Sequence, residues 1–219
     1  MKVAVILDVG VMLADVVKKN SGLIIGGFVP LTTIDFPGHL SAVIFCQGCP
    51  FNCIYCHNQD LIPRHKMRIS KYDWKYIEEF LHKRLHLLEA VVFSGGEPTL
   101  QPEVINVASI IKELGFKVGL HTAGCYPHRL KKLLPYLDWV GMDIKAPFDE
   151  YESITRIPNS GKLAFESVKI LLASGVDCEF RTTIDPRLLS DQQILEIANI
   201  LKEMGATNYK LQKCNYTKS

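Results

Sequence analysis

The feature that most constrains this chain is a regular alternation of short apolar runs and longer amphipathic stretches from Ser41 onward. This alternation is typical of βα units around a parallel sheet. Strands are expected at residues 41–46, 90–95, 117–122, 139–146, 178–185 and 209–213. Helices are expected at residues 70–85, 102–115, 128–137, 163–175 and 191–205, with cap residues at Ser70, Gly115, Gly175 and Gly205. Because an eight-fold barrel needs about 250 residues, six units predict an open, partial (β/α)6 TIM-like barrel of the α/β class.

The beginning of the chain does not fit this alternation. Residues 1–26 are expected to form an extension of unassigned role before a single core domain at residues 27–219, with an additional edge strand somewhere within residues 22–31. Asp8 and Asp15 interrupt the apolar start, which argues against a signal peptide or membrane anchor. We therefore expect a cytoplasmic protein that does not bind membranes.

Composition excludes several other classes. The 219 residues are 47% hydrophobic and 22% charged, as in globular proteins, and the net charge of +2 is too small to indicate nucleic acid as the main partner. The seven cysteines are an odd number with four crowded together, which does not resemble a secreted disulfide framework. Thiols in a reducing compartment remain available for metal or redox chemistry.

Polar clusters follow the predicted strands. They read CQGCPFNCIYC, SGGEP, HTAG, DIK and RTTID, and each begins where an apolar run ends. In parallel α/β folds the chemistry lies at the carboxyl ends of the strands. We therefore expect these clusters to meet in one site.

The first cluster contains Cys46, Cys49, Cys53 and Cys56. Its spacing differs from that of paired zinc knuckles and of the bacterial ferredoxin run, and a thioredoxin-type pair would leave two cysteines unused. The subset Cys49, Cys53 and Cys56, spaced CxxxCxxC, can bind three irons of a cubane cluster and leave the fourth iron open to a ligand. An ordinary metal knuckle is the alternative. Cys46 is expected to be a buried apolar side chain, with a fourth-ligand role as its alternative.

The CxxxCxxC spacing with Tyr55 before the last cysteine resembles the signature of the radical SAM superfamily. The resemblance implies one [4Fe-4S] cluster held by Cys49, Cys53 and Cys56, whose free iron is chelated by S-adenosylmethionine (SAM). One electron from the cluster then cleaves SAM to methionine and a 5′-deoxyadenosyl radical. No catalytic side chain beyond the cluster and the SAM site is expected.

The same resemblance assigns the other clusters to SAM. Gly95, Gly96 and Glu97 look like the family's GGE motif, in which an anionic Glu97 suits the ammonium of methionine; a simple turn is the alternative. Asp143, Ile144 and Lys145 resemble the DxK pattern of glycyl-radical-enzyme activases, with Lys145 neutralising the SAM carboxylate; a structural ion pair is the alternative. The resemblance also implies that SAM contacts Tyr55, near the adenine, as well as Cys56 and Thr122. His57 is a further expected contact, with a cap of the turn as its alternative. Arg181 is the last expected contact, with an ion pair at the edge of the core as its alternative.

The segment GGFVPLTTIDFPGHLSAVIFCQGCPFNCIYCHNQ narrows the branch. It is similar to the opening of anaerobic ribonucleoside-triphosphate reductase activating proteins, and pyruvate formate-lyase activases share many of its features. The chain departs from some activases at His121, where they carry an aspartate, and at Leu211 and Gln212, where they place a histidine. The resemblance implies that the radical abstracts a glycine hydrogen from a partner enzyme.

Partners follow from this resemblance. We expect a glycyl radical enzyme, with an anaerobic ribonucleotide reductase as the preferred kind, and a flavodoxin or ferredoxin electron donor. The basic residues 63–71 could bind an acidic donor, with a solvated face as the alternative. Three other functions remain open: an activase of the pyruvate formate-lyase type, a small-molecule radical SAM enzyme such as a deazaguanine synthase, and a non-catalytic iron–sulfur electron carrier.

Overall fold

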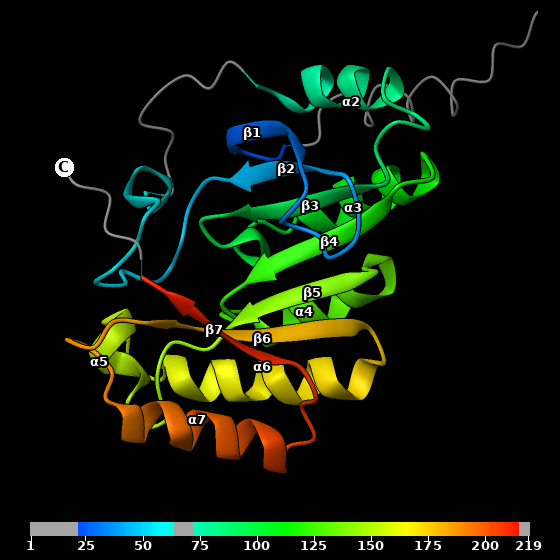
Figure 1. Ribbon diagram of the computed structural model, residues 1–219. Helices are drawn as coiled ribbons and strands as arrows, with labels where there is room; N and C mark the ends of the chain where they lie inside the picture. Colours follow the sequence, from blue (N-terminus) through cyan, green and yellow to red (C-terminus); the bar gives the residue numbers. More distant parts are fainter. Residues whose placement is uncertain (1–21, 64–71, 215–219) are drawn as a thin grey trace, which may run out of the picture.

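The strands form one sheet with the expected parallel core. A computed structural model describes residues 22–63 and 72–214, and its sheet contains seven strands in chain order from β1 to β7 (Figure 1). The strands are β1 (Ile25–Thr32), β2 (Ser41–Cys46), β3 (Ala90–Gly95), β4 (Lys117–Thr122), β5 (Trp139–Asp143), β6 (Asp177–Ile184) and β7 (Tyr209–Lys213). β1 is antiparallel to β2, and all later neighbours are parallel. Because β1 and β7 are the two edges, the sheet is an open partial barrel, as predicted.

The additional edge strand is confirmed as β1, which starts at Ile25, two residues before the expected core boundary at residue 27. That boundary itself stays a prediction. β5 ends at Asp143 rather than at residue 146, because the chain leaves the strand at the DIK motif. Residues 1–21, the basic residues 64–71 with the expected cap Ser70, and residues 215–219 lie outside the described residues.

Helices follow the strands, with bounds that differ from the prediction. They are α2 (Trp74–His82), α3 (Val104–Glu113), α4 (Pro127–Leu133), α5 (Tyr151–Thr155), α6 (Ser160–Ser174) and α7 (Asp191–Glu203). Three single turns of 3-10 helix, η1 (Gln59–Leu61), η2 (Pro98–Leu100) and η3 (Leu134–Tyr136), complete the set in the described chain. The side chain of Asp73 caps α2 by accepting a hydrogen bond from the Tyr76 amide at 2.8 Å. Within the described ranges, no helix is long and apolar enough to span a membrane.

The sheet buries apolar side chains on both faces, but in different ways. Side chains such as Ile44, Phe93 and Leu120 belong to the main core, which the helices complete. The opposite, inner face carries a smaller cluster of Val43, Ala90, Val92, Trp139 and Phe36. Alternation along each strand sends neighbours to opposite faces, so the helix-covered face is mainly apolar, with Thr122 and Thr182 as buried polar residues, while the inner face has polar residues nearer the carboxyl ends.

Phe36 closes the inner face at the amino ends of the strands. It comes from the connection between β1 and β2, is 5% exposed, and packs 5.6 Å from the ring of Trp139. Gly119 of β4 leaves space for it, since a Cβ there would lie 2.9 Å from the Phe36 ring. The polar side chains of the inner face that line the pocket, such as His121, Asp143 and Arg181, lie on the carboxyl side of Phe36.

We predict that Phe36→Ala destabilises the fold by about 3–5 kcal/mol, because it removes a buried ring and leaves a cavity against Trp139. The free energy of unfolding, measured in urea, checks this. Ile34→Ala is the matched control: Ile34 lies in the same connection but is 86% exposed, so its change should stay within about 0.5 kcal/mol. Equal effects of the two substitutions would contradict the role given to Phe36.

Candidate functional site

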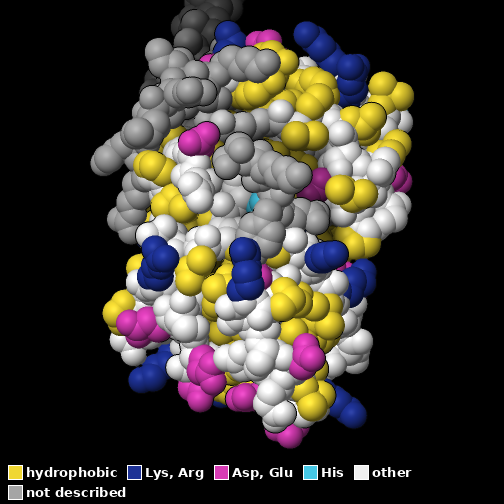
Figure 2. Space-filling model, turned by 60° about the vertical axis from the view of Figure 1, so that its left-hand side comes forward, with side chains coloured by type: hydrophobic (Ala, Val, Ile, Leu, Met, Phe, Trp, Pro, Cys, Tyr) yellow, Lys and Arg dark blue, Asp and Glu magenta, His cyan; other side chains and the backbone are white. Residues whose placement is uncertain are grey.

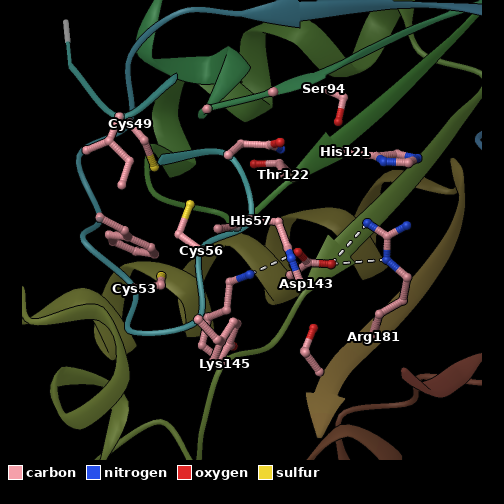
Figure 3. Close-up of a pocket in the computed structure, with 18 of the residues that line it drawn as sticks. Cys49, Cys53, Cys56, His57, Ser94, His121, Thr122, Asp143, Lys145 and Arg181 are labelled. Atoms are coloured by element: carbon pink, nitrogen blue, oxygen red, sulfur yellow. Dashed lines mark hydrogen bonds and ion pairs between the residues drawn. The ribbon is translucent and has the colours of Figure 1, made fainter. Parts of the chain in front are cut away.

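A pocket lies at the carboxyl ends of the strands, where the sequence predicted the site. Its volume is about 260 Å³, and it is walled by the loop after β2 and by the ends of β3 to β7 (Figure 3). The sequence-predicted residues that line it are Cys49, Cys53, Tyr55, Cys56, His57, Gly95, Gly96, Thr122, Asp143, Lys145 and Arg181. Glu97 and Ile144 are the two predicted residues that do not line it.

The loop at residues 47–63 carries all three cysteines and is held at both ends. The Gly48 amide donates to the Leu61 carbonyl at 2.7 Å, and the Cys49 amide donates to the Ile62 carbonyl at 3.1 Å. The Gln47 side chain donates to the carbonyls of Asp60 and Pro63 at 3.0 and 2.9 Å. Because these hydrogen bonds close the loop on itself, the cysteines are presented from a fixed frame rather than from a free connection. We call this segment the cysteine loop.

The three cysteines are partly buried and free of disulfides. Burial, reinforced by the charge of Glu97, raises the pKa of the Cys49 thiol to about 12, and burial raises the pKa of Cys53. A bound metal has the opposite effect on the pKa of a thiol, because it stabilises the deprotonated, coordinating thiolate. In the described part of the chain, no three His, Cys, Asp or Glu side chains converge on a single metal ion; in a cubane cluster each thiolate binds a different iron. The donor set and its place on one pocket wall fit such a cluster.

Gly95 and Gly96 bring the turn after β3 against the start of the cysteine loop. A Cβ on Gly96 would lie 2.2 Å from the Gly48 carbonyl oxygen, and one on Gly95 would lie 2.6 Å from the Cys46 amide. Gly95 also has a φ of +109°, which favours glycine. Two hydrogen bonds join the segments, from the Gly96 amide to the Cys46 carbonyl at 2.9 Å and from the Glu97 amide to the Gly48 carbonyl at 2.8 Å. The glycines therefore fix the loop as well as line the pocket.

Glu97 is completely buried and lies away from the pocket lining. Its Oε1 accepts hydrogen bonds from the Thr99 amide, the Thr99 hydroxyl and the Thr122 hydroxyl at 3.0, 2.6 and 2.8 Å. Its Oε2 accepts from the Ala123 amide at 2.8 Å and from the Cys125 thiol at 3.6 Å. Glu97 thus ties the turn after β3 to the turn after β4. The sequence did not reveal this, because it shows the type of residue but not the direction of its side chain.

Asp143 is the centre of a charged triad on the opposite wall (Figure 3). Lys145 Nζ donates to its Oδ2 at 2.9 Å, and Arg181 Nε donates to its Oδ1 at 3.1 Å. Burial alone would raise the pKa of Asp143, but Lys145 and Arg181 outweigh it and lower that pKa to about 2. Gly141 makes room for the guanidinium, since a Cβ there would lie 2.9 Å from Arg181 Cζ. The triad is a fixed arrangement of two cations around one carboxylate.

Ile144 lies between the two charged residues of the DIK motif but belongs to the core. It is fully buried, and its amide donates to the Arg181 carbonyl at 2.7 Å. Its carbonyl accepts from the Thr182 hydroxyl at 2.9 Å. The structure therefore places Ile144 as a spacer that orients its neighbours, without contact between its side chain and the pocket.

Tyr55 and Thr122 occupy the pocket with different partners. Lys145 Nζ lies 5.7 Å from the centre of the Tyr55 ring, and burial raises the pKa of Tyr55 to about 12. The Tyr55 hydroxyl has no hydrogen-bond partner among the described residues. The Thr122 hydroxyl, by contrast, donates to Glu97 and accepts from the Gly124 amide at 3.0 Å. The Tyr55 hydroxyl is therefore buried without a hydrogen-bond partner among the described residues, whereas the Thr122 hydroxyl is committed to Glu97 and Gly124.

The structure adds pocket residues that the predicted contact set did not include, among them Phe51, Asn58, Ile62, Ser94, His121, Ala123, Thr183 and Gln212. His121 Nε2 lies 2.9 Å from the Asp35 carbonyl, which can only accept, so this nitrogen carries the proton. Burial, with the charge of Arg181, lowers the pKa of His121. Strand alternation could have found several of these residues, because Thr183 lies two residues beyond Arg181 and pairs with Gln212.

We predict that Gly96→Ala weakens the cysteine loop, because its Cβ would overlap the Gly48 carbonyl. The expected loss of unfolding free energy is about 1–3 kcal/mol, with less iron retained per chain after anaerobic reconstitution. Gly27→Ala on β1 is the control, since its Cβ would meet the Phe45 side chain at an ordinary 3.7 Å. Normal iron content and stability in Gly96→Ala would refute the close approach.

We predict that Asp143→Asn destabilises the protein at pH 7 by about 1–2 kcal/mol, after allowance for its partial exposure. The pKa of Asp143 is lowered to about 2, so its contribution is complete above the unfolded-state value of about 3.9 and is lost as the pH falls toward 2. The difference in unfolding free energy between parent and variant should therefore shrink from pH 7 to pH 3. Asp177→Asn, at an exposed position of β6, should show no such trend. A difference that is constant with pH would contradict the triad.

Comparison with known proteins agrees with this geometry. Residues 43–201 match the model of the radical SAM superfamily. A candidate glycyl-radical enzyme activating enzyme of Methanocaldococcus jannaschii is 34% identical over 82% of this chain and 76% of its own length. A pyruvate formate-lyase-activating enzyme of Clostridium pasteurianum is 34% identical over 78% of this chain and 73% of its own.

Solved structures share the fold at low sequence identity. Streptococcus suis SuiB bound to S-adenosylmethionine superposes with a TM-score of 0.63 at 16% identity, over 79% of this chain and 40% of SuiB. Native anSMEcpe with bound AdoMet gives a TM-score of 0.61 at 16% identity, over 79% of this chain and 51% of its own. The chain thus spans two-fifths to half of these larger proteins. It belongs to the radical SAM superfamily, whose enzymes use a [4Fe-4S] cluster and S-adenosylmethionine, and within it to the family of glycyl-radical enzyme activating enzymes.

Proposed function

We propose that this chain activates an anaerobic ribonucleoside-triphosphate reductase by removing a hydrogen atom from one of its glycines. When bound, a reduced [4Fe-4S] cluster supplies one electron that cleaves S-adenosylmethionine to methionine and the radical that takes this hydrogen. The observation that carries the proposal is the placement of Cys49, Cys53 and Cys56 in one pocket with the triad of Asp143, Lys145 and Arg181. The opening segment from Gly26, similar to that of reductase activating proteins, supports this choice of partner.

Each wall of the pocket has a distinct task. Cys49, Cys53 and Cys56 would hold the cluster, and their number leaves one iron for SAM. The triad would bind the charged methionine end of SAM, with Lys145 and Arg181 facing its carboxylate. Since Lys145 and Arg181 already share Asp143, they are held in place before a ligand arrives. This preorganisation reduces the entropy lost on binding.

Gly95 and Gly96 would give SAM access to backbone groups beside the cluster. Glu97 fits an indirect role better, because its hydrogen bonds to Thr99, Thr122 and Ala123 hold the turns on which these backbone groups lie. The buried core beneath the pocket would keep water away from the reacting atoms. Tyr55 would offer its aromatic ring to the nucleoside end.

The open sheet suits a macromolecular substrate. β7 is an edge strand whose side chains are mostly exposed, so the pocket is not enclosed on that side by a further strand of the described chain. A glycine-bearing loop of a partner could enter there. The proposed docking of a flavodoxin or ferredoxin on the basic residues 63–71 concerns a segment that lies, apart from Pro63, outside the described residues.

We expect anaerobic reconstitution with iron and sulfide, followed by reaction with SAM, a chemical reductant and the reductase, to produce a glycyl radical on the reductase. Electron paramagnetic resonance checks this through the doublet of a glycyl radical. A doublet on pyruvate formate-lyase alone would replace the proposed partner, as the relative from Clostridium pasteurianum suggests. SAM consumption coupled to a small substrate, with no protein radical, would refute the activase function.

We predict that Cys49→Ser, Cys53→Ser and Cys56→Ser each abolish stable cluster binding, because a thiolate ligand is lost from a three-ligand site. Iron and sulfide content and SAM cleavage should both fall at least about tenfold. Cys178→Ser is the control: Cys178 is free and partly buried on β6, outside the pocket lining, so iron content should be unchanged. Full cluster content in any of the three pocket variants would exclude that residue as a ligand.

A further inference from the structure

A second cavity lies outside the pocket, between α5, α6 and α7. Its volume is about 750 Å³, and its floor is aromatic. The rings of Phe148 and Tyr151 stack at 5.9 Å with an interplanar angle of 9°, and Phe165 meets Phe148 edge-on at 5.1 Å. We call this cavity, which Ile200 of α7 also lines, the α5–α7 groove. Nothing in the proposed chemistry uses it.

The rim of the α5–α7 groove is acidic. Asp149, Glu152 and Glu196 line it, and none of their carboxylates has an ion pair or side-chain hydrogen bond to another described residue. Among the described residues of the lining, Lys162 at the start of α6 is the one cationic side chain. In Figure 2, acidic and hydrophobic side chains intermingle over the lower part of the face, at the height of α6 and α7 in Figure 1. Unpaired carboxylates around an aromatic floor complement a segment that is both basic and apolar.

α5 is shared by the groove and the pocket. Tyr151, whose ring forms part of the groove floor, accepts a hydrogen bond from the Lys145 amide at 3.0 Å and donates to the Asp143 carbonyl at 3.3 Å. At the other end of α5, the Thr155 carbonyl accepts from the Asn52 amide of the cysteine loop at 3.1 Å. A partner bound in the groove would therefore lie beside the wall of the pocket that must receive its glycine.

We propose that the α5–α7 groove binds a segment of the glycyl radical enzyme in which an aromatic or aliphatic side chain is flanked by lysine or arginine. This inference rests on the proposed function. The apolar side chain fills the aromatic floor, and the basic residues pair with Asp149, Glu152 and Glu196. An acidic electron donor is disfavoured here, because its charges would face these carboxylates.

The first test compares the parent with Glu152→Gln/Glu196→Gln and Glu152→Lys/Glu196→Lys. Association with the anaerobic reductase is measured at two salt concentrations. Rim charges act mainly on the association rate and its salt dependence, so the rate should fall stepwise through the series, by at least about fivefold for the lysine pair. SAM cleavage driven by a chemical reductant should stay unchanged, because neither residue lines the pocket. Glu166→Lys, on α6 but outside the groove lining, is the matched control.

Other occupants give other results, and each would overturn the inference. Equal association rates for all variants would remove the groove from partner binding. A change only in reduction by flavodoxin would assign the groove to the donor. Dissociation of a dimer by the lysine pair, with partner activation unaffected, would assign it to a second copy of the chain.

A second test does not depend on the identity of the partner. A labelled peptide with one phenylalanine between two arginines should bind the parent more tightly than the lysine-pair variant, and a peptide with glutamates in place of the arginines should show the reverse preference. Fluorescence anisotropy measures both. If the reductase binds no variant but the peptides behave as expected, the proposed partner is wrong and the groove inference stands. If the peptides do not discriminate, the groove inference is wrong whatever the partner.

Discussion

The parallel pairing of β2 to β7 is the constraint on which the site depends. Parallel strands bring their carboxyl ends to one edge, so residues separated by tens of positions become neighbours without any further device. Cys46 pairs with Gly95, Asp143 with Arg181, and Thr183 with Gln212. The cysteine loop and the charged triad are extensions of these strand ends. A shift of one residue in β5 or β6 would turn Asp143 or Arg181 from the inner face toward the helices.

The same constraint explains how much the sequence could reveal. The six parallel strands and most pocket residues were predictable, because apolar runs mark strands and polar clusters mark their ends. The direction in which a side chain points beyond the end of a strand could not be predicted from the sequence. Glu97 lies in a turn where alternation no longer applies, and five donors draw its carboxylate into the core. α5 was not predicted, because a helix of five residues in a polar connection is too short to show a helical repeat of apolar residues.

The two carboxylates of the site differ in the charge of their hydrogen-bond partners. Glu97 has its acceptor positions filled by neutral donors, so it has little capacity left for a ligand ammonium. Asp143 is shared by Lys145 and Arg181, which leaves the triad with one uncompensated positive charge. A ligand carboxylate would supply the missing negative charge. The electrostatics of the described pocket therefore favour an anionic group beside the triad.

α5 shows how a short element can connect recognition to chemistry. Its five residues could not form a stable helix alone, because a single turn does not repay the cost of nucleation. It is held instead at both ends by hydrogen bonds. At its start, the Tyr151 hydroxyl bonds the Lys145 amide and the Asp143 carbonyl; at its end, the Thr155 carbonyl accepts from the Asn52 amide of the cysteine loop. Tyr151 therefore joins the floor of the groove to the backbone of Asp143 and Lys145 through direct hydrogen bonds. The hydrogen bond to the Asp143 carbonyl, at 3.3 Å, is longer than the one from the Lys145 amide, at 3.0 Å, so it is the weaker of the two links between α5 and the triad.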